Sequence, residues 1–105
     1  MVLIGLFGCK KNDEIPEHLI GKEQMTAILV DIHLLEARIE KLELPNDSAD
    51  AVYKAFEWDL LVNKHQVDTL QYFKSFKYYT NNLKHFNDVY DEVLKEMERK
   101  QKDKF

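Results

Sequence analysis

The sequence predicts an all-α protein, a small bundle of four helices with short connections. Two observations support this fold class. Apolar residues recur at helical spacing in four successive stretches. Only three glycines and two prolines occur in 105 residues, and so few helix breakers favour long helices over a strand-rich fold. No stretch alternates apolar and polar residues over enough positions to indicate a strand.

The first helix is predicted over residues 22–42. Its main apolar stripe follows the i, i+3, i+4, i+7 pattern and comprises Met25, Ile28, Leu29, Ile32, Leu35 and Ile39. A second strip, on another side, comprises Ala27, Val30, Leu34 and Ala37. Apolar residues on two sides predict a central helix with neighbours on both.

The remaining helices follow after short breaks. Pro45 interrupts the pattern, and one of the next three residues is expected to cap a second helix over 48–64. Asp68 and Gln71 resemble a capping box at the start of a third helix. The pair Asn81-Asn82 forms the turn before a fourth helix. The predicted buried faces are Ala49, Val52, Tyr53, Phe56 and Leu60; Tyr72, Phe73, Phe76 and Tyr79; and Leu83, Phe86, Val89, Tyr90, Val93, Leu94 and Met97.

The N-terminal sequence is typical of a targeting signal. Residues 2–7 are apolar apart from one glycine, and polarity begins abruptly at Lys10. Leu6-Phe7-Gly8-Cys9 resembles a lipobox, in which a diacylglyceryl group is added to the cysteine and the leader is cut before it. The leader is short and lacks a basic start, so the anchor requires either a start codon upstream of Met1 or an unusually short signal. The alternative is a free cysteine in a frayed apolar tail.

We therefore divide the chain into a signal-peptide remnant over 1–8, a lipidated flexible tether over 9–19 and a helical domain over 20–105. The run Lys10-Lys11-Asn12-Asp13-Glu14 resembles the signal that sends some Bacteroidota lipoproteins to the cell surface, and a generic solvated linker is an equal alternative. The expected location is the outer membrane, facing the periplasm or the cell surface.

Composition narrows the function classes. The net charge of −4 offers no basic excess to neutralise phosphates, so we expect no nucleic-acid partner. The single cysteine cannot form an intramolecular disulfide. Histidines are scattered without ligand spacing, so we expect no metal site and no cofactor.

The first helix carries the most unusual polar residues. Glu36 falls inside the predicted apolar arc, with His33 one turn earlier and Asp31 at the opposite edge. A buried carboxylate needs a partner or a proton. We favour a buried hydrogen-bond network, in which Glu36 accepts from a tyrosine such as Tyr79 or from a lysine. The alternative is an acid–base or metal pair of His33 and Glu36.

Two residues of the third helix are further candidates. Ser75 has no nucleophile elbow or oxyanion loop around it, so we interpret it as a small packing residue rather than a nucleophile. Tyr78 points away from the aromatic stripe, and it either lines a partner groove or packs on another helix.

The chain resembles the Bacteroidota lipoprotein family called domain of unknown function 4296. The matching pieces, in order, are Ile15-Pro16 with Leu19-Ile20 and Met25; Asp31 to Ala37; Tyr72 to Tyr79; and Leu83 with Val89-Tyr90 and Val93. Two loops differ: the family often has glycine where this chain has His65-Gln66, and proline where it has Asn81-Asn82. The resemblance implies a lipidated cysteine ahead of this helix order and implies no activity.

We expect a non-catalytic, lipid-anchored module that binds another envelope protein. One alternative is an envelope holdase or assembly factor, which predicts a large exposed apolar patch. A second alternative is an enzyme using His33 and Glu36, which predicts that both side chains reach a common pocket.

Overall fold

The structure is a computed structural model that describes residues 15–104. The leader, Cys9 and most of the expected tether lie outside the described residues. Four α-helices and one π-helical segment follow in order: α2 (Lys22–Lys41), α3 (Asn46–Trp58), η1 (Asp59–Lys64), α4 (Thr69–Thr80) and α5 (Leu83–Lys104). The all-α prediction is confirmed, and within residues 15–104 no strand is present.

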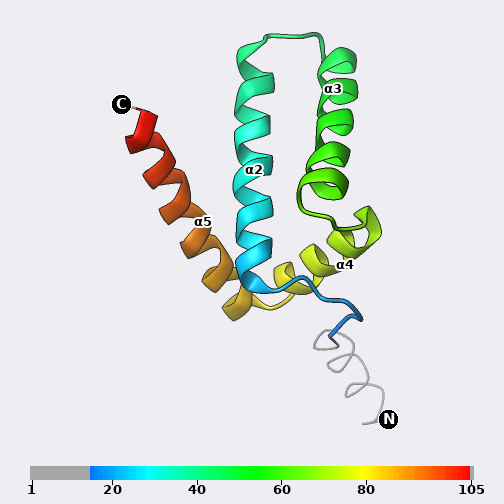
Figure 1. The fold of residues 1–105 in the computed structure, drawn as a ribbon, viewed down its shortest axis with the longest axis vertical. Coiled ribbons are helices and arrows are strands. Elements are labelled where there is room, and N and C mark those ends of the chain that lie inside the picture. The colour runs from blue at the N-terminus through cyan, green and yellow to red at the C-terminus, as the bar shows by residue number, and fades with distance from the viewer. Residues whose placement is uncertain (1–14, 105) are drawn as a thin grey trace, which may run out of the picture.

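The helices are arranged around α2 (Figure 1). α3 runs antiparallel to α2 on one side, α5 lies on the other side, and α4 crosses at the end where α2 begins. α2 contacts α3, η1 and α5, which confirms that it is the central helix with neighbours on two sides. None of the described helices is both long enough and apolar enough to cross a bilayer.

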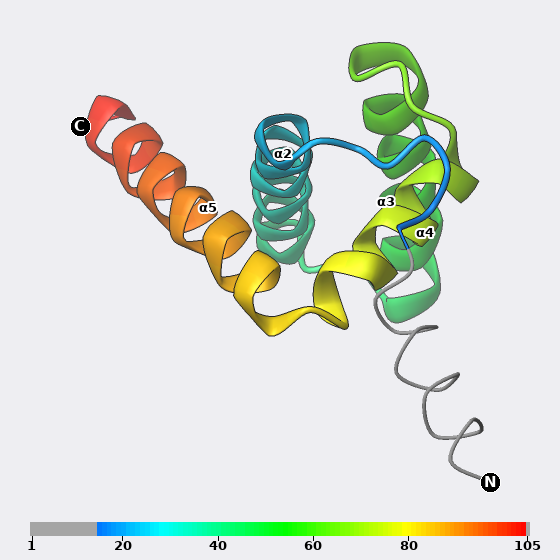
Figure 2. The same cartoon turned by 90° about the horizontal axis from the view of Figure 1, so that it is seen from below.

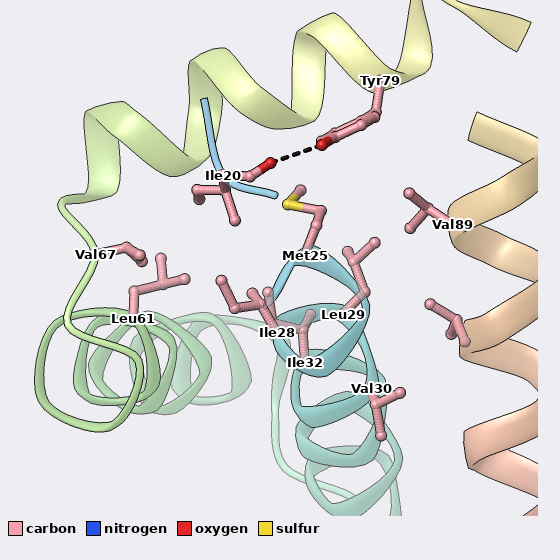
Figure 3. Packing of buried hydrophobic residues seen from close by; sticks show 11 residues of the cluster. Ile20, Met25, Ile28, Leu29, Val30, Ile32, Leu61, Val67, Tyr79 and Val89 are labelled. Carbon is pink, nitrogen blue, oxygen red and sulfur yellow. Dashed lines mark hydrogen bonds between the residues drawn. The ribbon is translucent and has the colours of Figure 1, made fainter. Parts of the chain in front are cut away.

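The core is small and gathers around the first half of α2 (Figure 3). Its members from α2 are Met25, Ile28, Leu29, Val30 and Ile32, joined by Ile20, Leu61, Val67, Tyr79, Val89 and Val93. The predicted stripe of the first helix is therefore buried over most of its length. α3, in contrast, has no buried residue.

The segment before α2, residues 15–21, is bound to α4 and is called the incoming segment below. The Ile20 backbone N–H donates to Ser75 Oγ at 3.0 Å, and the Tyr79 hydroxyl donates to the Ile20 carbonyl at 2.6 Å (Figure 3). Gln71 Nε2 also donates to the His18 carbonyl at 2.8 Å. The two bonds to Ile20 satisfy buried backbone groups that no regular secondary structure would pair.

The helix boundaries agree closely with the predicted ones, apart from two differences at the second helix. The predicted single helix is α3 followed by η1, in which the His65 N–H donates to the Leu60 carbonyl, five residues earlier, at 2.9 Å. The expected side-chain cap after Pro45 is wrong, because Pro45 itself is the N-cap residue and no side chain bonds to the helix end. The predicted capping box of Asp68 and Gln71 is confirmed at the start of α4.

Four residues of the predicted buried faces are exposed: Phe56, Phe73, Leu83 and Leu94. Phe73 is 70% exposed. Because α4 packs against the backbone of the incoming segment, the small Ser75 occupies the buried side of the helix instead. Leu83 is 73% exposed because it lies at the first residue of α5, beyond the contact with α2. Leu94 is also exposed, whereas Val89 and Val93 hold the contact.

Candidate interaction site

Glu36 lies on the surface, and its expected burial is wrong. Its side chain is 51% exposed. The side of α2 on which Glu36 lies agrees with the prediction, because Met25 and Leu29 lie on the same side of the helix and are buried. α4, however, lies at the end where α2 begins (Figure 1), whereas Glu36 belongs to the second half of α2.

Glu36, His33 and Tyr90 form a hydrogen-bonded chain. His33 Nδ1 lies 2.9 Å from Glu36 Oε1, and His33 Nε2 lies 3.3 Å from the Tyr90 hydroxyl. The expected partners of Glu36, Tyr79 or a lysine, are wrong: Glu36 bonds to His33, and Tyr79 bonds to Ile20. A histidine that donates through Nδ1 to a carboxylate keeps Nε2 free to accept from a hydroxyl. The chain therefore fixes the orientation of Tyr90.

Two further tyrosines lie near this chain on other helices. Tyr53 of α3 donates to Glu57 Oε2 at 3.0 Å. Burial raises the pKa of Tyr53 and of Tyr72 on α4, and the negative charges of Glu57 and Glu36 raise both pKa values further. Burial and then Glu36 likewise raise the pKa of Tyr90. We call these residues the tyrosine cluster: Tyr53, Tyr72 and Tyr90 with Glu36 and Glu57.

Aromatic rings extend the tyrosine cluster along α4 and α5. Phe76 stacks on Tyr72, with ring centroids 5.9 Å apart, and Phe86 packs on Tyr90 at 4.6 Å. The three tyrosines and both phenylalanines are half-buried. The result is a half-exposed aromatic surface with two carboxylates, built by α2, α3, α4 and α5 together.

The acid–base alternative requires a pocket at His33 and Glu36. The Glu36–His33–Tyr90 chain could relay a proton, but a buried reaction centre needs a pocket that excludes water. Neither of the two hollows described below is lined by His33 or Glu36. Within residues 15–104 no group of three or more histidine, cysteine, aspartate or glutamate side chains could hold a metal.

Asp31 belongs to a different site, on the opposite side of α2. Its carboxylate lies 2.7 Å from His65 Nε2 and 2.9 Å from Lys64 Nζ. Burial raises the pKa of Asp31, but the hydrogen bonds and charges of Lys64 and His65 outweigh it and hold the pKa below its usual value. The three residues line a cleft of about 820 Å³ between α2 and α5. Side chains of both signs line it, so its charge favours no ligand class.

The remaining predicted residues have structural roles in the described chain. Ser75 is fully buried and accepts from Ile20, in agreement with its interpretation as a packing residue. Tyr78 packs on another helix: its ring stacks on His85 of α5 at 5.9 Å. The structure therefore brings His33 and Glu36 together and leaves Asp31, Ser75 and Tyr78 apart from them. Cys9 lies outside the described residues.

Sequence reasoning missed Tyr53, Glu57, Tyr72 and Tyr90 as site residues. The three tyrosines occupy predicted core faces, where aromatic residues are usually read as packing. The pairing of Tyr53 with Glu57, four residues later on the same helix, was the one signal in the sequence.

These features define a small all-helical domain whose surface carries a tyrosine cluster and a charged cleft. Residues 16–103 match the family model described as Domain of unknown function (DUF4296), so the chain belongs to this family. The family description assigns no molecular function. No curated protein and no solved structure matches the chain.

Proposed function

We propose that this protein is a lipid-anchored outer-membrane lipoprotein whose helical domain is a non-catalytic module that binds another envelope protein. The observation that carries the binding role is the tyrosine cluster. Tyrosine is enriched at protein interfaces, because its rigid ring contributes contact area and its hydroxyl contributes a hydrogen bond. The proposed anchor is the lipid on Cys9, supported by the lipobox-like sequence.

The cluster also indicates the chemistry of the partner. The negative charge of Glu36 raises the pKa of Tyr53, Tyr72 and Tyr90, and that of Glu57 raises the pKa of the first two. Carboxylates and tyrosine faces both attract cations. A partner segment that presents an arginine or lysine side chain fits this surface best.

Exposed apolar residues support binding of a folded partner more than a holdase role. They are spread over the α2–α3 turn, α3, α4 and α5, as Leu42, Phe56, Trp58, Leu70, Phe73, Leu83 and Leu94. An apolar groove between helices would suit an extended chain, but the larger cleft is lined mainly by charged residues. The holdase alternative is therefore less well supported.

Site-specific photocrosslinking of the lipidated chain in cells tests the proposal. The crosslinking residue replaces Phe56, which is exposed on the same helix as Tyr53, or Leu42 as a comparably exposed control. We expect one discrete crosslinked protein from position 56 and none from position 42. Glu36→Gln with Glu57→Gln should lower that yield at least about fivefold, because two charge-assisted contacts are lost. Glu40→Gln, on the exposed side of α2, serves as the matched control.

Identical products from positions 56 and 42 would contradict the binding role, since a specific surface must distinguish them. A yield that is unchanged by Glu36→Gln with Glu57→Gln would contradict the assignment of the tyrosine cluster.

A further inference from the structure

α4 presents an exposed face that combines apolar and basic side chains. Leu70 is 57% exposed and Phe73 is 70% exposed, and Lys74 and Lys77 are exposed beside them. We call these four residues the α4 outer face. Part of it lines a hollow of about 340 Å³, whose lining residues are Phe73, Lys74, Phe76, Lys77 and Thr80.

The charge of α4 differs from that of the whole chain. Residues Thr69–Thr80 contain two lysines and no acidic residue, although the chain carries a net charge of −4. The nearest carboxylate in sequence, Asp68, is engaged in the capping box at the N-terminus of the helix. The α4 outer face is therefore a local basic and aromatic surface on an acidic protein.

The incoming segment sets an upper limit on the distance between the α4 outer face and Cys9. The His18 carbonyl is hydrogen-bonded to Gln71 of α4, and Cys9 is nine residues before His18. A fully extended chain spans about 3.3–3.6 Å per residue, so Cys9 lies within about 30 Å of α4. Figure 2 views the molecule from this end, where α4 and the incoming segment are seen together. The turn between α2 and α3, with Leu42, lies at the opposite end (Figure 1).

We infer that the α4 outer face docks on an anionic lipid surface, with Phe73 at the interface and Lys74 and Lys77 among the phosphates. The inference rests on the lipid anchor at Cys9 proposed above. Aromatic rings favour the boundary between headgroups and acyl chains, and lysines reach phosphates while their stems cover apolar surface. Anionic headgroups attract basic residues within a Debye length of the surface, and the anchor keeps α4 close to that surface. Docking orients α2 and α3 so that Leu42 points away from the membrane.

The single tryptophan of the chain makes a direct test possible. The lipidated full chain is prepared as Trp58→Phe with Phe73→Trp, and as Trp58→Phe with Leu42→Trp. Both new positions are exposed, so neither substitution disturbs the core. Mass spectrometry first verifies the lipid on Cys9. Each protein is then reconstituted into phosphatidylcholine vesicles that contain about 30% phosphatidylglycerol and brominated acyl chains, which quench tryptophan near the interface.

We expect quenching at position 73 to exceed quenching at position 42 at least about threefold, because only the first lies at the interface. Adding Lys74→Gln with Lys77→Gln should reduce quenching at position 73 to the level at position 42. Vesicles of phosphatidylcholine alone should have the same effect.

Equal quenching at the two positions of a lipidated protein overturns the docking and leaves the anchor standing. Quenching that survives the lysine substitutions overturns the anionic assignment. A discrete protein crosslink from position 73, without lipid quenching, assigns the face to a protein partner and overturns the inference. An unmodified Cys9 overturns the anchor and the docking together.

Discussion

Ser75 shows how one small residue determines the packing of α4. Its hydroxyl accepts the backbone N–H of Ile20, and both groups are buried. A larger side chain at this position would separate α4 from the incoming segment. The neighbouring bond from Tyr79 to the Ile20 carbonyl holds the other backbone group of the same residue.

Replacing Ser75 with alanine should therefore lower the free energy of unfolding by about 1–3 kcal/mol, because the buried Ile20 N–H loses its acceptor. Urea denaturation followed by circular dichroism measures the change. Ser48→Ala, at an exposed position, is the matched control and should change stability by less than about 0.5 kcal/mol. A similar effect from both substitutions would rule out a special role for the Ser75 hydroxyl.

Asp31 should make stability depend on pH in the acid range. Its pKa in the folded chain lies below the ordinary value of 3.8, where Lys64 and His65 outweigh the effect of burial. The stabilisation is therefore present above that ordinary value and is lost as the pH falls through the lower, folded pKa. Asp31→Asn should cost about 1–2 kcal/mol at pH 7 and progressively less as the pH falls towards 2, because protonation of Asp31 removes the difference in charge between the two chains.

Urea midpoints of the wild-type and Asp31→Asn chains, measured at both pH values, provide the test. Asp91→Asn, which neutralises an exposed carboxylate on α5, controls for the change in net charge. A difference between wild type and Asp31→Asn that persists unchanged near pH 2 would show that the ion pairs are not its source.

One connection between helices holds a residue in the unfavourable left-handed backbone conformation. Gln66, in the loop before α4, has φ of 56°, in the left-handed region that favours glycine. This is the loop in which His65-Gln66 stands in place of the glycine that the family resemblance implies. A residue with a β-carbon therefore holds a conformation that glycine adopts without strain.

Gln66→Gly should therefore raise the free energy of unfolding by about 0.5–1 kcal/mol, because relief of left-handed strain exceeds the extra entropy of glycine in the unfolded chain. Thermal unfolding measures the gain. Gln101→Gly, within the exposed part of α5, should instead lower stability by up to about 1 kcal/mol. Gln66→Ala keeps a β-carbon and should bring no gain; a gain equal to that of glycine would contradict the strain.

The elements themselves were largely predictable, and the reasons are local. The stripe of α2 and the capping box of α4 are short-range patterns, so their positions follow directly from the sequence. The exposure of Glu36 and Phe73 was not predictable, because it depends on where α4 crosses α2 and on the thin segment that α4 packs against. The tyrosine cluster was missed for the same reason: Tyr53, Tyr72 and Tyr90 come from three helices.

At the scale of the whole molecule, the proposed lipid on Cys9 and the α4 outer face should contribute very unequally to membrane attachment. Two lysines and one phenylalanine at an interface give weak, salt-sensitive binding, whereas each buried methylene of an acyl chain contributes about 0.8 kcal/mol. Cys9→Ala should therefore move the protein from the membrane pellet to the supernatant after a high-salt wash. The urea midpoint should stay unchanged, because the described core begins at Ile20.

Fractionation and immunoblotting measure the distribution, and mass spectrometry of the wild-type chain measures the lipid. Lys10→Ala with Lys11→Ala changes the charge next to Cys9 without removing its sulfur, so this control should remain in the pellet. If Cys9→Ala stays in the pellet after the wash, attachment must come from another part of the molecule. Combining Cys9→Ala with Lys74→Gln and Lys77→Gln then separates the two sources, since release only in the combined variant would make the α4 outer face a second anchor rather than an orienting contact.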